Sequence, residues 1–163
     1  MTFSRLLRHF LMTHRRVERA FPTRTLHAIE NAIAAAEKSH GGEIRFAVEG
    51  ELHTPDLLRN LSSRQRAAQV FGQLGVWDTE DNNGVLIYVL LADRNVELIA
   101  DRGYRGKVKD AEWAEVCRLM EQAFRQGEFE RGVLDGVAAT SQLIARNFPT
   151  SDANELPNQP VLL

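Results

Sequence analysis

Apolar residues recur at helical spacing in five segments of the chain. Spacings of three and four residues place these side chains along one stripe, which is the pattern of a helix that packs against a core. Prolines and glycines separate the segments, because neither residue continues a helix well. The stripes run from Phe3 to Phe21, from Leu26 to Ala36, from Ala67 to Leu74, from Trp113 to Phe124 and from Phe129 to Phe148. We therefore predict five amphipathic helices.

Strand patterns occupy shorter segments between these helices. Residues 43–49 carry large apolar side chains at every second position, and this period of two predicts a strand in which Ile44, Phe46 and Val48 face inward. Residues 85–92 are apolar throughout, which is typical of a central strand buried on both faces. The first strand thus has one apolar face, and the second has two.

A third strand is predicted over residues 95–101. It follows the central strand after the short turn at residues 93–95, and so short a connection predicts an antiparallel hairpin. The order along the chain is helix, helix, strand, helix, strand, strand, helix, helix. Few strands and many amphipathic helices predict an α/β fold in which a small sheet is covered by helices.

Breaks in the pattern divide the chain into three parts. Residues 1–22 are predicted to form a basic amphipathic N-terminal helix that ends at a proline. Residues 23–149 hold the strands and the other helices, and we expect them to form one α/β domain. Residues 150–163 contain two prolines and no periodic pattern, which predicts a mobile C-terminal tail.

The N-terminal helix combines an apolar stripe with an unusual charge. Between residues 3 and 21 it carries five arginines and a single acidic residue, Glu18. Such a helix can pack on its own domain or a second copy, lie on an anionic membrane, or dock in the groove of a protein partner. We favour packing on its own domain or on a second copy, because an exposed apolar stripe promotes aggregation.

Composition restricts the cellular compartment and the partners that can be expected for this protein. The 163 residues carry a net charge of -2, which gives the whole molecule no general attraction to nucleic acid. A single cysteine excludes an intrachain disulfide and fits a reducing compartment. No apolar run approaches the roughly 20 residues of a membrane helix. The N-terminus lacks the continuous apolar region and the cleavage site of a signal peptide, so we expect a cytoplasmic protein.

Sequence motifs of the common enzyme classes are absent from the chain. It contains no nucleophile elbow, zinc-protease helix, phosphate loop or cysteine pair. The five histidines are scattered, without the spacing of metal ligands. The one cysteine, Cys117, lies in an apolar helical stripe, where a buried and inert thiol is expected. We therefore predict no organic cofactor.

Acidic side chains gather at one end of the predicted hairpin. Pairing outward from its turn places Leu86 opposite Asp101, so that Asp78 and Asp81 enter the hairpin where Asp101 leaves it. Carboxylate and amide oxygens suit a hard cation such as calcium or magnesium. We therefore predict that these three aspartates are the metal ligands if a site exists. The alternative is that residues 81–84 form only a solvated turn.

Four short motifs in register resemble the core of the TPM-domain family, which is named for a thylakoid-lumen protein, a photosystem repair protein and a modulator of nematode receptors. The motifs are Gly75-Val76-Trp77, Asp81-Asn82-Asn83-Gly84, Ala92-Asp93-Arg94-Asn95 and Asp101-Arg102-Gly103-Tyr104. The resemblance covers about residues 25–148. It implies a three-layer α/β/α sandwich around a small mixed sheet.

The same resemblance leaves two functions open. Some members of the family bind divalent cations and some are acid phosphatases, whose reaction here would rely on Asp81 and Asp101 with a metal ion. One expectation is an accessory or binding module that takes a divalent cation and assists a membrane or envelope protein. The other is a weak metal-dependent or acid phosphatase. An enzyme should show a pocket where Asp81, Asp101 and Arg102 converge, whereas a binding module should leave these side chains in solvent.

Overall fold

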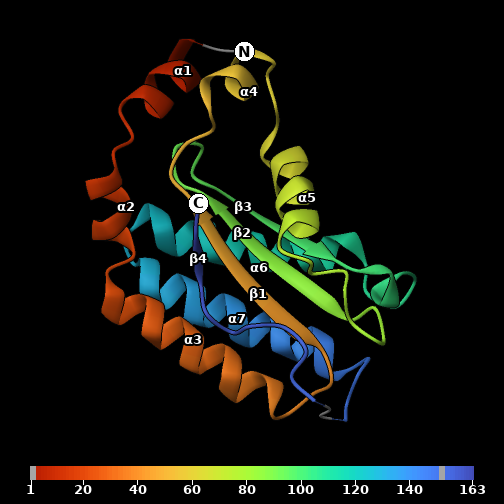
Figure 1. Cartoon of the computed structure of the whole chain (residues 1–163). Helices are drawn as coiled ribbons and strands as arrows, with labels where there is room; N and C mark the ends of the chain where they lie inside the picture. Colours follow the sequence, from red (N-terminus) through yellow and green to blue (C-terminus); the bar gives the residue numbers. More distant parts are fainter. Residues whose placement is uncertain (1–2, 151–152) are drawn as a thin grey trace.

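A four-stranded mixed sheet forms the centre of the molecule in the computed structural model, which describes residues 3–150 and 153–163 (Figure 1). The strands lie in the order β3-β2-β1-β4. β1 runs parallel to β2 and β4, and β2 runs antiparallel to β3. The strands are β1 (Glu43–Glu49), β2 (Gly84–Leu90), β3 (Asn95–Ala100) and β4 (Val161–Leu162). The mixed sheet confirms the fold that the family resemblance implies.

Helices cover both faces of this sheet and make three layers. One face packs against α3 (Thr23–Glu37), α6 (Asp110–Arg125) and α7 (Phe129–Ala145). The opposite face packs against α4 (Thr54–Leu58) and α5 (Ser63–Gln73). The longest helices thus share one side of the sheet (Figure 1). The α/β/α sandwich is confirmed.

The central strand β2 is buried along its whole length, as its apolar run predicts. Val85, Ile87 and Val89 belong to the core beneath α3, α6 and α7, whereas Leu86 and Tyr88 belong to the core beneath α5. On β1, the three apolar residues that were predicted to face inward pack into the first of these cores. Alternation along the strands therefore assigns the layers correctly.

The charged positions of β1 are also buried, although their alternation predicts an outward face. Glu49 accepts hydrogen bonds from Arg66 Nε at 2.8 Å and Nη2 at 2.9 Å, and also from the Tyr88 hydroxyl. The Arg45 guanidinium donates to two carbonyl oxygens of the C-terminal tail, and Glu43 accepts from two of its amides. Buried charges are tolerated when they are paired in this way.

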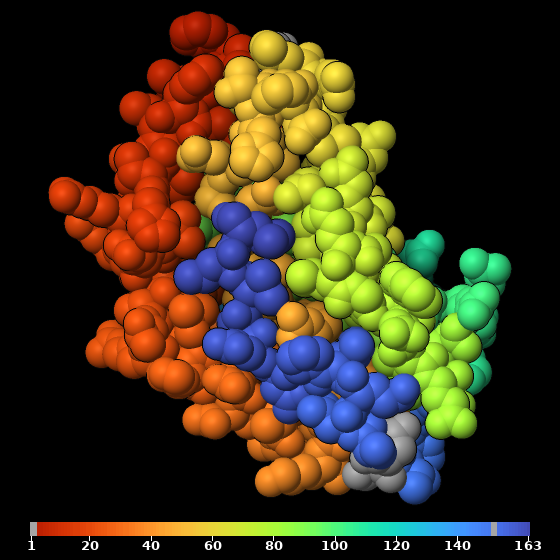
Figure 2. All heavy atoms as spheres, in the orientation of Figure 1, coloured from red at the N-terminus to blue at the C-terminus, as the bar shows by residue number. Residues whose placement is uncertain are grey.

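The tail follows the open edge of β1, whereas its prolines and lack of period predict mobility. Val161 and Leu162 pair in parallel with Ala47 and Val48, and Leu156 is buried in the core beneath α5. Figure 2 shows the tail, in blue, lying between α3 in orange and α5 in yellow-green. The predictions for residues 1–2 and 151–152 lie outside the described residues.

The predicted N-terminal helix is divided into α1 (Phe3–Phe10) and α2 (His14–Ala20). Val17 of α2 and the following Phe21 belong to the core. Phe3, Leu7 and Phe10 of α1 are instead exposed, whereas Leu6 is partly buried against the core beneath α5. Packing of the stripe on its own domain is therefore seen for α2 only. Among the described residues, none of the helices combines the length and apolar character needed to cross a membrane.

Candidate functional site at the end of the sheet

Two loops meet at the end of the sheet where the predicted aspartates lie. The first loop enters β2, and the second follows β3 and forms the short 3₁₀ helix η1 (Arg102–Tyr104). The amide of Gly103 donates to the Asn82 carbonyl at 2.9 Å, and Arg102 Nε donates to Asn82 Oδ1 at 2.6 Å. The Tyr104 hydroxyl donates to the Asn83 carbonyl at 2.7 Å. The predicted meeting of the two loops is confirmed.

The predicted register of the hairpin is wrong by two residues. Leu86 pairs with Ile99 rather than with Asp101, because the turn between β2 and β3 is centred between Ala92 and Asp93. Arg94 closes this turn in the left-handed region, with φ of 53°. The amide of Asp101 donates instead to the Gly84 carbonyl at 2.9 Å. Asp101 still leaves the hairpin where the first loop enters it.

Two glycines allow the backbones at this end to approach one another. A Cβ atom on Gly103 would lie 2.4 Å from the Asn82 carbonyl oxygen, and one on Gly84 would lie 2.1 Å from the Val76 carbonyl oxygen. Carbon and oxygen atoms that are not bonded cannot approach this closely, so both positions require glycine. Gly103 therefore serves the contact between the two loops, and Gly84 serves a close approach within the first loop.

The three predicted ligands differ in their surroundings. Asp78 and Asp81 are exposed. Asp101 is partly buried, and its Oδ1 accepts the amide of Arg102 at 2.7 Å. Asp101 Oδ2 is shielded from solvent and has no hydrogen-bond partner among the described residues. Within residues 3–150 and 153–163, no group of three or more histidine, cysteine or acidic side chains is placed to hold a metal ion.

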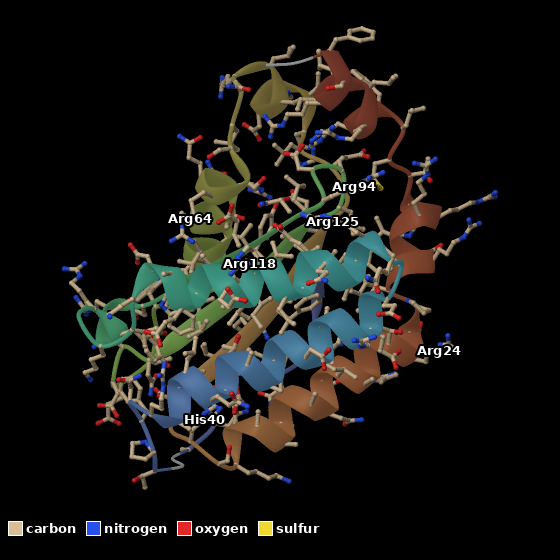
Figure 3. The ribbon with its side chains drawn as sticks, turned by 180° about the vertical axis from the view of Figure 1, so that it is seen from behind. Arg24, His40, Arg64, Arg94, Arg118 and Arg125 are labelled. Carbon is tan, nitrogen blue, oxygen red and sulfur yellow. The ribbon has the colours of Figure 1, made fainter. Side chains whose placement is uncertain are left out.

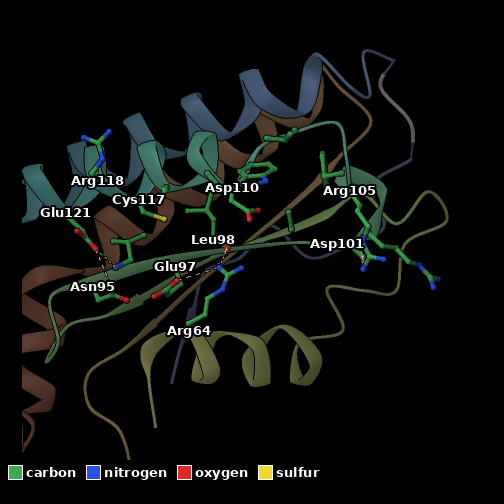
Figure 4. A pocket seen from close by; sticks show the side chains of 17 residues that line it. Arg64, Asn95, Glu97, Leu98, Asp101, Arg105, Asp110, Cys117, Arg118 and Glu121 are labelled. Atoms are coloured by element: carbon green, nitrogen blue, oxygen red, sulfur yellow. Dashed lines mark hydrogen bonds and ion pairs between the residues drawn. The ribbon is translucent and has the colours of Figure 1, made fainter. Parts of the chain in front are cut away.

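A groove of about 810 Å³ begins at Asp101 and follows the outer edge of β3 between α5 and α6 (Figure 4). Asp101 and Arg102 both line it, but Asp81 does not. The predicted pocket is thus formed by two of its three residues. Asp110, at the start of α6, lines the same end of the groove.

Side chains cover the free backbone edge of β3 along this groove. Arg64 of α5 donates to the Leu98 carbonyl, and Glu121 of α6 accepts the amide of Val96 at 3.1 Å. An open strand edge otherwise pairs readily with another chain, and charged side chains are a common protection. Neither Arg64 nor Glu121 stands in a sequence motif, so neither was predicted as a residue of the site. Their role could be predicted only if β3 were already known to lie at the edge of the sheet.

A family model described as the TPM domain matches residues 18–143, which is well over half of the chain. The chain belongs to the TPM-domain family. The match includes all three predicted aspartates and both loops, whereas α1 and the C-terminal tail lie outside it.

Solved structures resemble this TPM domain over most of its length. The BA42 protein of the psychrophilic bacterium Bizionia argentinensis, solved by NMR, is 33% identical, with a TM-score of 0.71 over 86% of this chain and 93% of that one. The N-terminal domain of a protein from P. gingivalis is 19% identical, with a TM-score of 0.63 over 82% of each chain, and supports the fold alone. A search of the curated proteins found no match.

The thiol in the groove of this TPM domain is not activated. Burial raises the pKa of Cys117 to about 11, and the negative charges of Glu97 and Glu121 act in the same direction. A thiol with so high a pKa stays protonated at neutral pH, whereas a nucleophilic cysteine needs the thiolate. Cys117 therefore agrees with the inert thiol expected from the sequence. The chemistry of the groove rests on its carboxylates and arginines.

Proposed function

We propose that this TPM domain is a binding module that takes calcium or magnesium at the Asp101 end of the groove and assists a membrane or envelope protein. The observation that carries the proposal is the shielded Oδ2 atom of Asp101, which has no hydrogen-bond partner among the described residues. Buried carboxylate oxygens are normally hydrogen-bonded or coordinate a metal ion. A bound cation would supply the missing partner.

Oxygen atoms near Asp101 fit the needs of a hard cation. The carbonyl oxygens of Asp81 and Asn82 face Gly103, and the carboxyl group of Asp110 lines the same end of the groove. Calcium takes about six to eight oxygen ligands and accepts carboxylates, carbonyls and water together. In this proposal Asp101 is the inner ligand, and the exposed Asp78 and Asp81 approach from the solvent side.

Phosphate-ester hydrolysis is the alternative function. Four arginines line the groove that contains Asp101, namely Arg64, Arg102, Arg105 and Arg118. Guanidinium groups bind phosphate oxygens in a planar, two-point geometry. In this alternative, Asp101 holds a cation that activates water for attack on phosphorus, because Cys117 is protonated and supplies no nucleophile.

Thermal melts with and without millimolar calcium or magnesium test the binding proposal. A ligand that binds only the folded protein raises its melting temperature. We expect an upshift in the unmodified protein and in the control variant Asp135→Asn, which changes an exposed acid on α7. We expect no upshift in Asp101→Asn. No upshift in the unmodified protein, or an equal one in Asp101→Asn, would contradict the proposal.

A phosphatase assay on the same samples separates the two functions. Turnover of p-nitrophenyl phosphate that needs the cation and is lost in Asp101→Asn supports the enzyme. A cation-dependent upshift without turnover supports the binding module alone. Turnover that survives both a chelator and Asp101→Asn would remove Asp101 from the reaction.

A further inference from the structure

Helix α1 packs on the domain mainly through polar side chains, with Leu6 partly buried beside them. The Arg5 guanidinium donates to both carboxylate oxygens of Asp93, at distances from 2.8 to 3.1 Å, and Arg8 Nε donates to the Ala92 carbonyl at 3.0 Å. The ring of His9 is buried, with Nε2 3.2 Å from Asp93 Oδ1. Burial alone would raise the pKa of Asp93, but Arg5 and His9 outweigh it and hold that pKa below its usual value. Charged groups therefore fix α1 to the turn between β2 and β3.

The apolar face of the same helix is left in solvent. Phe3, Leu7, Phe10 and Leu11 are 81%, 48%, 69% and 53% exposed, and Leu58 of α4 is 61% exposed. Figure 1 shows α4 beside α1. Soluble proteins rarely expose so many large apolar groups together unless another surface covers them. Because α1 is held by its polar side, its apolar side remains available to such a surface.

Exposed arginines lie on α2 and in the β2–β3 turn, close to α1. Arg16 and Arg19 of α2 and Arg94 of the β2–β3 turn are exposed, and none makes an ion pair or side-chain hydrogen bond within the described residues. Figure 3 labels Arg94 in this region. The three arginines border a cavity of about 510 Å³ whose lining includes Met12 and Phe124. Apolar lining beside free guanidinium groups suits an anionic head group with an apolar chain.

The positive charge of this surface favours an anionic membrane over a second copy of the chain as its partner. Arg5 and Arg8 already bind the β2–β3 turn, but residues 11–20 carry three further, exposed arginines against one glutamate, although the whole chain has a net charge of -2. In a symmetric dimer the same surface meets itself, so these arginines would face one another. An anionic lipid surface complements them instead.

We propose that α1, α2 and the β2–β3 turn form a docking surface for a membrane that contains anionic lipids. The exposed side chains of α1 enter the boundary between head groups and acyl chains, with the helix lying in the plane of the membrane. Arg16, Arg19 and Arg94 pair with lipid phosphates. This surface lies at the opposite end of β2 from Asp101 and does not depend on cation binding.

Co-sedimentation of the full chain with vesicles tests the apolar part of this surface. The protein should sediment with vesicles of phosphatidylcholine mixed with phosphatidylglycerol, and not with phosphatidylcholine alone. The double variant Leu7→Glu/Phe10→Glu should lose this binding while keeping its circular dichroism spectrum and melting temperature. The control Leu119→Glu changes an exposed leucine of α6 and should bind like the unmodified protein.

The arginines are tested in the same assay. Removing both charges in Arg16→Gln/Arg19→Gln should weaken binding by about fivefold per arginine, and added salt should weaken binding by the unmodified protein. The control Arg105→Gln changes an exposed arginine at the other end of the sheet and should leave binding unchanged. Absence of binding to the mixed vesicles, or equal binding to both vesicle types, would overturn the proposal. A dimer in light scattering that Leu7→Glu/Phe10→Glu dissociates would overturn it as well, by assigning the surface to a second copy.

Discussion

The buried carboxylate of Glu49 depends on one arginine. Arg66 reaches it with two nitrogen atoms, and both side chains are nearly inaccessible to solvent. The hydrogen bond that Arg66 donates to Glu49 is the largest cause of the raised pKa of Arg66. Burial raises the pKa of Tyr88, so that the phenol stays protonated as a donor. The three groups form one closed network.

Arg66→Met should destabilise the domain by about 3–5 kcal/mol, because it leaves the Glu49 charge buried without its partner. The matched control is Arg118→Met, which removes an exposed ion pair with Glu115 and should change stability by less than about 1 kcal/mol. Urea denaturation of both variants measures the difference. Equal stability of the two would show that the network contributes little.

Stability should fall with rising pH because of Glu37. Burial raises the pKa of Glu37 from 4.5 to about 7, and the nearby charge of Glu43 adds to the effect, while the amide of Ile44 donates to Glu37 Oε1 at 2.9 Å. The folded state therefore holds this proton more tightly than the unfolded chain. Its stabilising contribution is complete below pH 4.5 and is lost as the pH rises through about 7.

Glu37→Gln should remove this part of the pH dependence, because the amide keeps an acceptor for Ile44 and carries no charge. We expect the difference between the two profiles to reach about 2 kcal/mol, a value reduced for the partial exposure of the side chain. Chemical denaturation from pH 4 to 8 measures it, with the exposed Glu80→Gln as control. Superimposable profiles for Glu37→Gln and the unmodified protein would contradict the assignment.

Residue types alone predicted part of the candidate site. Asp101 and the loop of Asp81 meet as expected, because a hairpin brings its two ends together whether or not its register is placed correctly. The different burial of Asp78, Asp81 and Asp101 could not be predicted, since it depends on how η1 and α6 pack around the loops. The groove likewise lies between α5 and α6, which are far apart in sequence.

At the scale of elements, periodicity predicted most of the fold. The continuous apolar run of β2 and the stripes of α3, α6 and α7 indicate burial directly, and the structure places them in the core. The tail was not predicted in this way, because many of its contacts are backbone hydrogen bonds to β1 and to buried charges. Such contacts produce no periodic pattern of apolar residues in the sequence. α1 differs because it is held by Arg5 and Arg8 rather than by its apolar stripe.

Docking of the tail has a direct test at Leu156. Its side chain is buried in the core beneath α5, so Leu156→Ala should destabilise the domain by about 2–3 kcal/mol. Leu163→Ala, which changes an exposed leucine of the same tail, should alter stability by less than about 0.5 kcal/mol. Thermal or urea denaturation compares them. If the tail were mobile, both variants would have the stability of the unmodified protein.

At the scale of the whole molecule, β2 separates two surfaces of different chemistry. Asp101 and the acidic loops lie where the strand begins, and α1 with its arginines lies where it ends, roughly 20 Å further along a strand of this length. A domain docked on a membrane through α1 would hold the cation end away from the lipid. That end would then face a protein partner at the membrane surface.

Amide NMR spectra of the labelled protein can show whether a divalent cation binds beside Asp101. On titration with calcium, we expect the largest shifts at residues 81–84 and 101–104, whose backbones are joined by hydrogen bonds, and we expect Asp101→Asn to abolish them. Absence of shifts at millimolar calcium, or shifts centred on α1 or the tail, would contradict the proposed binding.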